Sequence, residues 1–175
     1  MKSKPLAKCA NVQPNHPERY NPYAVNVTSS TATQYLTVQD VLWLNFELTK
    51  QTNHFDFAIL EESTFYQYGY GISNNPQTLA GRFMAGFMKK PVFGSGDAAT
   101  AFAGFVAFLM LNGYELDLPD TEAAGWVTRV KNGEIKAEEA VAKLSHLSAG
   151  HHEGDARHCM AYAIELYPKT LGALL

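Results

Sequence analysis

The segment DAATAFAGFVAFLMLNG, residues 97–113, carries the longest apolar run in the sequence. One set of its side chains recurs at the three- and four-residue spacing of a helix face: Phe102, Phe105, Val106 and Leu109. Phe108 and Leu111 lie off this face, so a helix here is apolar nearly all round, as buried helices are. We therefore expect a central, buried helix from about Asp97 to Asn112, ended by Gly113 in the left-handed conformation that glycine tolerates.

Six further helices are expected around this one, from apolar periodicity, capping residues and chain breaks. They span about Val38 to Lys50, Phe57 to Tyr66, Pro76 to Lys90, Pro119 to Asn132, Ala137 to Leu147, and a last helix that contains Met160 and Tyr167 and ends at Pro168. Thr37 with Asp40, and Asn75 before Pro76, are expected to cap two of them. No segment is a convincing strand, although the glycines of Gln67–Gly71 favour a turn or a short β-hairpin. The predicted fold class is all-α.

Length and composition suit a single-domain helical bundle. The chain has 175 residues, of which 46% are hydrophobic and 12% aromatic, enough for one compact core. Its beginning is rich in Pro, Asn, Ser and Thr and has no periodicity, so residues 1–34 are expected to form an irregular N-terminal arm. The helical domain is predicted at 35–147, and a C-terminal helix and tail at 148–175.

Charge and apolar patterning argue against nucleic acid and membranes as partners. The formal net charge is −3, whereas proteins that bind phosphate polymers or anionic membranes normally carry a basic excess. The run from Ala98 to Leu111 is shorter than the roughly 20 residues that a membrane span needs. Three prolines within Met1–Tyr20 leave no apolar run for a secretion signal. We therefore expect a cytoplasmic protein.

Several segments resemble, in this order along the chain, the Fic/Doc (Fido) family, in its death-on-curing-like branch. They are Tyr35–Val41, similar to the family's opening helix, Ile59–Ser63, Phe108–Leu116 with its Phe-Leu-x-x-Asn-Gly-Tyr pattern, and Asn132–Ile135 with the helix after it. The resemblance covers roughly Tyr35 to Leu147. It implies a helical core, a flap that pairs with a target peptide, and a loop–helix motif of the form His-Pro-Phe-x-Asp/Glu-Gly-Asn-Lys-Arg-Thr.

The motif of the resembled family falls on residues 91–100, where Phe93, Gly96 and Thr100 agree with it. In the family the histidine is a general base, the acidic residue holds magnesium, and the later asparagine, lysine and arginine help to hold nucleotide phosphates. The corresponding positions here are Pro91, Ser95, Asp97, Ala98 and Ala99. The resemblance therefore implies a degenerate motif with no catalytic residue.

The surrounding sequence also lacks the side chains that such chemistry requires. A general base must titrate within reach of the proton that it removes, yet no histidine occurs from Phe55 to Ser145. Phosphoryl transfer needs cations where negative charge spreads, yet no Lys or Arg occurs between Pro91 and Thr128. The loss of catalysis is thus expected from the neighbourhood as well as from the motif.

We therefore expect a pseudoenzyme, a binding or regulatory scaffold derived from a toxin–antitoxin system, that needs no cofactor. Its partner is expected to be a protein, either an antitoxin-like protein or a target peptide bound at Tyr66–Gly71. The alternative is an active AMP- or phosphotransferase that uses ATP and Mg²⁺ in a rearranged site. In that case Asp97 serves as base or metal ligand, with help from His54 or a histidine of the tail.

Two small sites are also open to sequence reasoning. A helix that begins after Gly94, Ser95 and Gly96 could present free N–H groups to an anion, unless Asp97 caps these donors itself. On a helix His151, Asp155 and His158 share a face, which gives a metal site unless the cluster is a solvated helix entrance.

Overall fold

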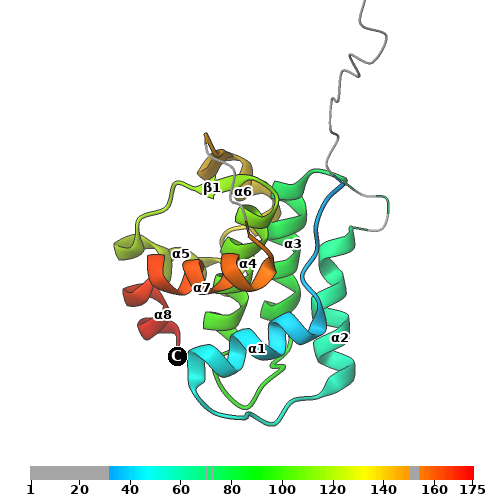
Figure 1. The fold of residues 1–175 in the computed structure, drawn as a ribbon. Coiled ribbons are helices and arrows are strands. Elements are labelled where there is room, and N and C mark those ends of the chain that lie inside the picture. Colours follow the sequence, from blue (N-terminus) through cyan, green and yellow to red (C-terminus); the bar gives the residue numbers. More distant parts are fainter. Residues whose placement is uncertain (1–31, 70, 72, 150–153) are drawn as a thin grey trace, which may run out of the picture. The chain divides into compact units, whose positions relative to one another are not determined.

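Helix α4, Asp97–Leu111, is the helix about which the others are arranged (Figure 1). Every residue from Ala99 to Leu111 is buried, and the side chains of Phe102, Phe105 and Phe108 are fully enclosed. The expectation of a central helix that is apolar on all sides is confirmed. It needs neighbours on every side because burial of apolar surface supplies most of the stability of such a helix.

The structure, a computed structural model, describes residues 32–69, 71, 73–149 and 154–175. The described residues belong to one compact unit, Ala32–Leu175. Of the predicted arm at 1–34, residues 1–31 lie outside the described part. Within the described part, no helix combines the length and the apolar character needed to cross a membrane.

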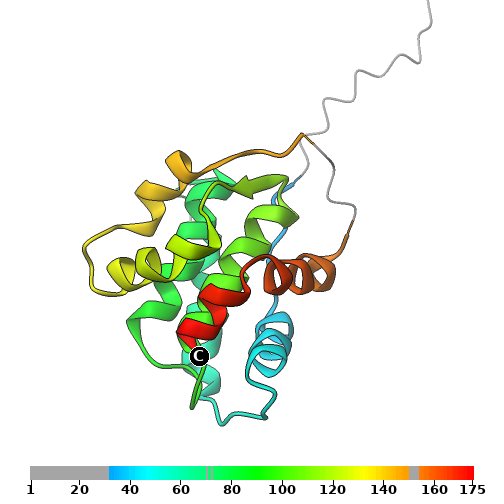
Figure 2. The same ribbon diagram turned by 90° about the vertical axis from the view of Figure 1, so that its left-hand side faces the viewer.

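Helix α4 packs most extensively against four helices, and the two ribbon views agree on their placement around it (Figures 1 and 2). They are α1 (Val38–Thr49), α3 (Pro76–Lys89), α7 (Ala156–Leu166) and α8 (Pro168–Leu174). Helices α2 (Phe57–Phe65) and α6 (Ala137–Leu144) pack against α3. Helix α5 (Asp120–Lys131) packs against α8 and reaches α4 where Trp126 stacks on Phe105. The helices after residue 148 thus share one core with the rest, and the all-α prediction is confirmed.

The expected helix caps are present. Thr37 and Asp40 form a capping box, in which each side chain accepts a backbone N–H of the other residue. The Asn75 side chain accepts from the backbone of Gln77 and Thr78 at the start of α3, with Pro76 as its first residue. These local signals explain why the starts of these two helices could be predicted to the residue.

One pair of short strands forms at two segments where the sequence shows no convincing strand. β1 (Tyr114–Leu116) and β2 (Ser145–Leu147) pair antiparallel, with Tyr114 opposite Leu147. The predicted helix to Leu147 therefore ends at Leu144, and its last three residues become β2. Three-residue strands are too short to show an alternating pattern, and two helices separate them in the sequence, so this pairing has no local signal.

The region predicted as a turn or short hairpin contains a turn in its described residues. Tyr66–Tyr68 form the 3-10 helix η1, followed by Gly69 with φ +63°. Gly71 has φ +81°, and Tyr70 between them lies outside the described residues. The two-stranded sheet of this protein is therefore found elsewhere, between β1 and β2.

Pro168 begins a helix rather than ending one, which corrects the prediction for the C-terminus. α7 ends at Leu166, and Pro168 is the first residue of α8. The carboxylate of Asp120 accepts from the backbone N–H groups of Lys169 (3.1 Å) and Thr170 (2.8 Å). Partial burial works to raise the pKa of Asp120, but these hydrogen bonds outweigh it and hold the pKa below its usual range. A carboxylate distant in sequence thus caps α8, and no local pattern predicts this.

Tyr167, between α7 and α8, makes the stability of the fold depend on pH in the alkaline range. Its buried hydroxyl donates to the backbone oxygen of Leu118 at 2.9 Å. Burial, together with the carboxylates of Asp120 and Asp117, raises the pKa of Tyr167 to about 12 from an ordinary value of 10.0. Below pH 10 the phenol is neutral in both states, but above it the unfolded chain loses the proton first, so stability falls until the folded phenol also ionises.

We expect the free energy of unfolding to fall between about pH 10 and 12 by about 1–2 kcal/mol more in the wild type than in Tyr167→Phe. At neutral pH the variant should be less stable by about 1 kcal/mol, because the Leu118 carbonyl loses its donor. Urea titrations at several pH values measure both effects. An identical alkaline loss in the two proteins would exclude Tyr167 as its source.

Candidate functional site

The loop at residues 91–96 corresponds to the motif of the resembled family. Several of its backbone N–H groups are held by hydrogen bonds within the protein. Oδ1 of Asp97 accepts from the N–H of Val92 (2.9 Å) and of Phe93 (3.0 Å). Gly94 donates its N–H to the backbone oxygen of His54 at 3.0 Å, beside an isolated bridge between Phe55 and Phe93. Of the two possibilities left open by the sequence, Asp97 does not cap the N–H groups of α4, and its carboxylate accepts from the preceding turn instead.

Ser95 belongs to a polar network with helix α1. Its hydroxyl donates to Oδ1 of Asn53 (3.1 Å), and its backbone oxygen accepts from Nδ2 of Asn45 (3.0 Å). The same Asn45 amide reaches Oγ1 of Thr100, and Asn53 donates to Oδ1 of Asn45, both at 3.0 Å. Sequence reasoning missed Asn45 and Asn53. The available signal was Asn45 itself, a polar residue one position after Leu44 on the apolar stripe of α1, and its side chain is 2% exposed.

The start of α4 is enclosed by chain segments that are distant in sequence. Gly96 has φ +78°, which favours glycine, and no side chain caps the helix there. A Cβ on Gly96 would lie 2.7 Å from Cγ2 of Thr49, 3.2 Å from Nδ2 of Asn45 and 3.5 Å from Cδ2 of Leu175. The end of α1 and the last residue, Leu175, therefore pack against the loop. The anion site predicted at Gly94–Asp97 is thus surrounded by the side chains of Thr49, Asn45 and Leu175.

The remaining motif positions offer no polar chemistry. Pro91 is exposed, Ala98 is half-buried, and Ala99 is fully buried in the core. A cationic side chain in place of Ala99 would have to enter this core, where burial of an unpaired charge is costly. The three positions thus contribute packing or surface and no titratable group.

A cavity of about 220 Å³ remains next to the loop. Its described lining residues are Leu42, Asn45, Phe46, Gln51, Thr52, Asn53, Phe55 and Phe93. They are apolar or neutral polar residues, and none carries a formal charge. This composition suits an uncharged group and gives a nucleotide triphosphate no counter-charge.

The segment predicted to meet a target peptide, Tyr66–Gly71, presents aromatic rings at the surface. Tyr68 is 38% exposed and stacks on Tyr35, with ring centroids 4.3 Å apart. Phe65, 37% exposed, lies edge-on to Tyr68 at 5.6 Å. The Tyr66 ring contacts two cations, with Arg82 Cζ 4.8 Å and Lys89 Nζ 3.8 Å from its centroid. Such rigid aromatic side chains are typical anchors of protein interfaces.

The predicted metal cluster of His151, Asp155 and His158 lies only partly within the described residues. His151 lies outside the described residues, whereas Asp155 is the N-cap of α7 and accepts from the N–H of His158 at 3.0 Å. Among the described residues, no group of three His, Cys, Asp or Glu side chains is placed to hold a metal ion. The described part of the cluster therefore has a capping role.

Together, the loop at 91–96, the Asn45 network and the neutral cavity make a site that can enclose an uncharged group, and the aromatic surface lies on α2 and η1. The described lining of the neutral cavity contains no Lys, Arg or His side chain. No protein-family model, curated protein or solved structure matches the chain.

Proposed function

We propose that this chain is a catalytically degenerate Fic/Doc-like protein of the cytoplasm that acts as a binding or regulatory scaffold, derived from a toxin–antitoxin system. One observation carries the proposal. The two polar side chains at the substituted positions of the motif, Ser95 and Asp97, are engaged by the protein itself, Ser95 with Asn53 and Asp97 with the amides of Val92 and Phe93. Side chains that hold their own loop are not poised to take a proton or a metal ion.

The surroundings of the loop support the same conclusion. Transfer of a phosphoryl or nucleotidyl group requires positive charge near the phosphates, and the lining of the adjacent cavity is neutral. His54 is the histidine nearest in sequence to the loop, and its backbone oxygen accepts the N–H of Gly94. These features favour a binding role over the alternative of an active AMP- or phosphotransferase with ATP and Mg²⁺.

The partner is proposed to be a protein that meets the aromatic surface formed by Tyr35, Phe65 and Tyr68. Their stacked and edge-on contacts fix the rings before any partner binds, which lowers the entropic cost of association. Phe65 is the last residue of α2 and Tyr68 the last of η1, whereas Tyr35 precedes α1 and also contacts Phe108 of α4, with ring centroids 6.0 Å apart. The double variant Phe65→Ala, Tyr68→Ala should bind the partner at least tenfold more weakly than the wild type. Calorimetric titration with the purified partner measures this affinity.

We expect no transfer of label when the protein is incubated with labelled ATP, Mg²⁺ and a cell lysate, and no heat of binding with ATP or GTP. Asp97→Ala should leave these null results unchanged and lower the free energy of unfolding by about 2–3 kcal/mol, because two amides lose a charged acceptor. Urea denaturation measures the stability effect, and autoradiography measures the transfer.

Glu165→Ala is the matched control, since it removes an exposed carboxylate from α7 and should change stability by no more than about 0.5 kcal/mol. Robust labelling of a lysate protein that disappears in Asp97→Ala would overturn the proposal and favour the active transferase. An unchanged stability of Asp97→Ala would remove the structural role assigned to this carboxylate.

A further inference from the structure

A second cavity, of about 300 Å³, lies along the C-terminal half of α4. Its lining residues come from α4, β1, the segment into α5, and α7: Val106, Met110, Glu115, Leu116, Leu118, Asp120, Tyr162, Leu166 and Tyr167. The motif loop precedes the opposite, N-terminal end of α4. The volume is at the lower end of the roughly 300–1,000 Å³ that is typical of ligand sites. It therefore suits a small molecule.

The cavity has an apolar floor and an accessible mouth. Val106 and Met110 are buried, with exposed fractions of 2% and 4%. Tyr162 and Leu166, one turn apart on α7, are 40% and 43% exposed. An apolar group that enters past these two side chains would meet an apolar wall on α4, and removal of its surface from water would favour binding.

The charges around this cavity are predominantly negative. Glu115 and Asp120 line it, Asp117 lies between them in the sequence, and no Lys or Arg occurs between residues 91 and 128. The phenol of Tyr167, which also lines the cavity, experiences this field, because burial and then the Asp120 and Asp117 carboxylates raise its pKa. Among the described residues, the charge of Lys169 acts on Asp120, and His146, when it is protonated, pairs with Glu115 and Asp117.

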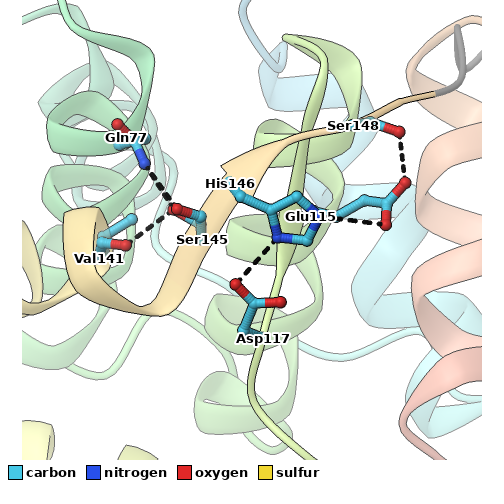
Figure 3. A network of polar contacts seen from close by, with 7 residues as sticks. All are labelled: Gln77, Glu115, Asp117, Val141, Ser145, His146 and Ser148. Atoms are coloured by element: carbon cyan, nitrogen blue, oxygen red, sulfur yellow. Dashed lines mark hydrogen bonds and ion pairs between the residues drawn. The ribbon is translucent and has the colours of Figure 1, made fainter.

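The two carboxylates of the lining differ in what they already bind. Asp120 accepts the first amides of α8 with both oxygens. Glu115 extends from β1 toward Ser148 and His146 (Figure 3), accepting from the Ser148 hydroxyl, with its Oε2 3.8 Å from Nε2 of His146. The side chain of Glu115 is 46% exposed. Glu115 therefore presents a partly exposed carboxylate in the lining of the cavity.

We propose that this cavity binds a small organic cation, an apolar body that carries a primary ammonium group. The apolar body lies against Val106 and Met110, and the ammonium donates to Glu115 at the rim. Charge selects among ligands of equal shape: an ammonium is attracted, an alcohol is neutral, and a carboxylate is repelled. The proposal concerns a site apart from the motif loop and does not depend on the function of that loop.

Three probes of one shape test the proposal on the full chain: 4-phenylbutylammonium, 4-phenylbutanol and 4-phenylbutyrate. Titration followed by NMR should shift the methyl signals of Met110, Leu116 and Leu118, with the affinity order ammonium, alcohol, carboxylate. The advantage of the ammonium should shrink as salt is added, because exposed charges are screened. Equal or tighter binding of the carboxylate, or binding of none of the probes, would overturn the proposal.

Two variants locate the site. Glu115→Gln should weaken the ammonium by about fivefold and leave the alcohol unchanged, whereas Glu122→Gln, which removes the same charge from an exposed position outside the lining, should alter neither. Leu166→Trp should block the mouth and abolish binding of both probes while the melting temperature stays within a few degrees, since Leu166 is at the surface. Binding that none of these changes affects would place the ligand elsewhere and exclude the cavity.

Discussion

Gly81→Ala is expected to destabilise the fold by at least about 2 kcal/mol, although alanine favours helices. Gly81, in α3, faces the first residues of α6. A Cβ at Gly81 would be 2.6 Å from the backbone N of Glu138, 2.7 Å from its Cα and 2.8 Å from the backbone C of Ala137. These are backbone atoms, so no side-chain rotation relieves the clash and α6 must move. Urea denaturation measures the loss, and exchange of the α6 amides should accelerate.

Gly125→Ala is the matched control for this substitution. Gly125 also lies inside a helix, α5, but a Cβ there would have no described neighbour within 4 Å outside its own helix. Alanine should therefore stabilise the protein by about 0.5–1 kcal/mol through helix propensity alone. The two variants share their chemistry and differ only in the approach of α6. A stabilising effect at both positions would contradict the close packing of α3 and α6.

These two glycines illustrate what sequence reasoning can and cannot predict about this fold. Gly81 and Gly125 each lie within a helical sequence pattern. No local feature of the sequence shows that Gly81 packs against the backbone of another helix whereas Gly125 does not. The starts of α1 and α3 were predictable, because Thr37 with Asp40 and Asn75 with Pro76 are caps that act within a few residues. Long-range features were not, such as the hydrogen bonds of Asp120 to α8.

The candidate site divides along the same line. The lack of histidines and cations around residues 91–100 is a property of the sequence and could be stated from it. The hydrogen bonds of Asp97 to the preceding turn could not, because Asp97 was also well placed to cap α4. The choice between the two depends on the path of the loop, which the bridge between Phe55 and Phe93 helps to fix. The cavity lined by Val106 and Leu166 depends equally on long-range packing.

Gln67→Ala is expected to lower the free energy of unfolding by about 3–5 kcal/mol. The Gln67 side chain is fully buried, and its amide pairs with both backbone groups of Leu36: the Leu36 N–H donates to Oε1 (2.9 Å), and Nε2 donates to the Leu36 oxygen (2.7 Å). Truncation leaves two buried backbone groups without partners, at about 1–3 kcal/mol each, and opens a cavity. This contact fixes the segment before α1 against η1, which also carries the exposed Tyr68.

Gln67→Met separates the two contributions, because methionine fills most of the volume and restores neither hydrogen bond. It should lose about 2–3 kcal/mol, and the Leu36 amide should exchange with solvent much faster than in the wild type. The exposed Gln51→Ala serves as the control, with an effect within about 0.5 kcal/mol. A methionine variant as stable as the wild type would show that packing alone holds Leu36, and the two hydrogen bonds would then have no part in positioning the aromatic surface for a partner.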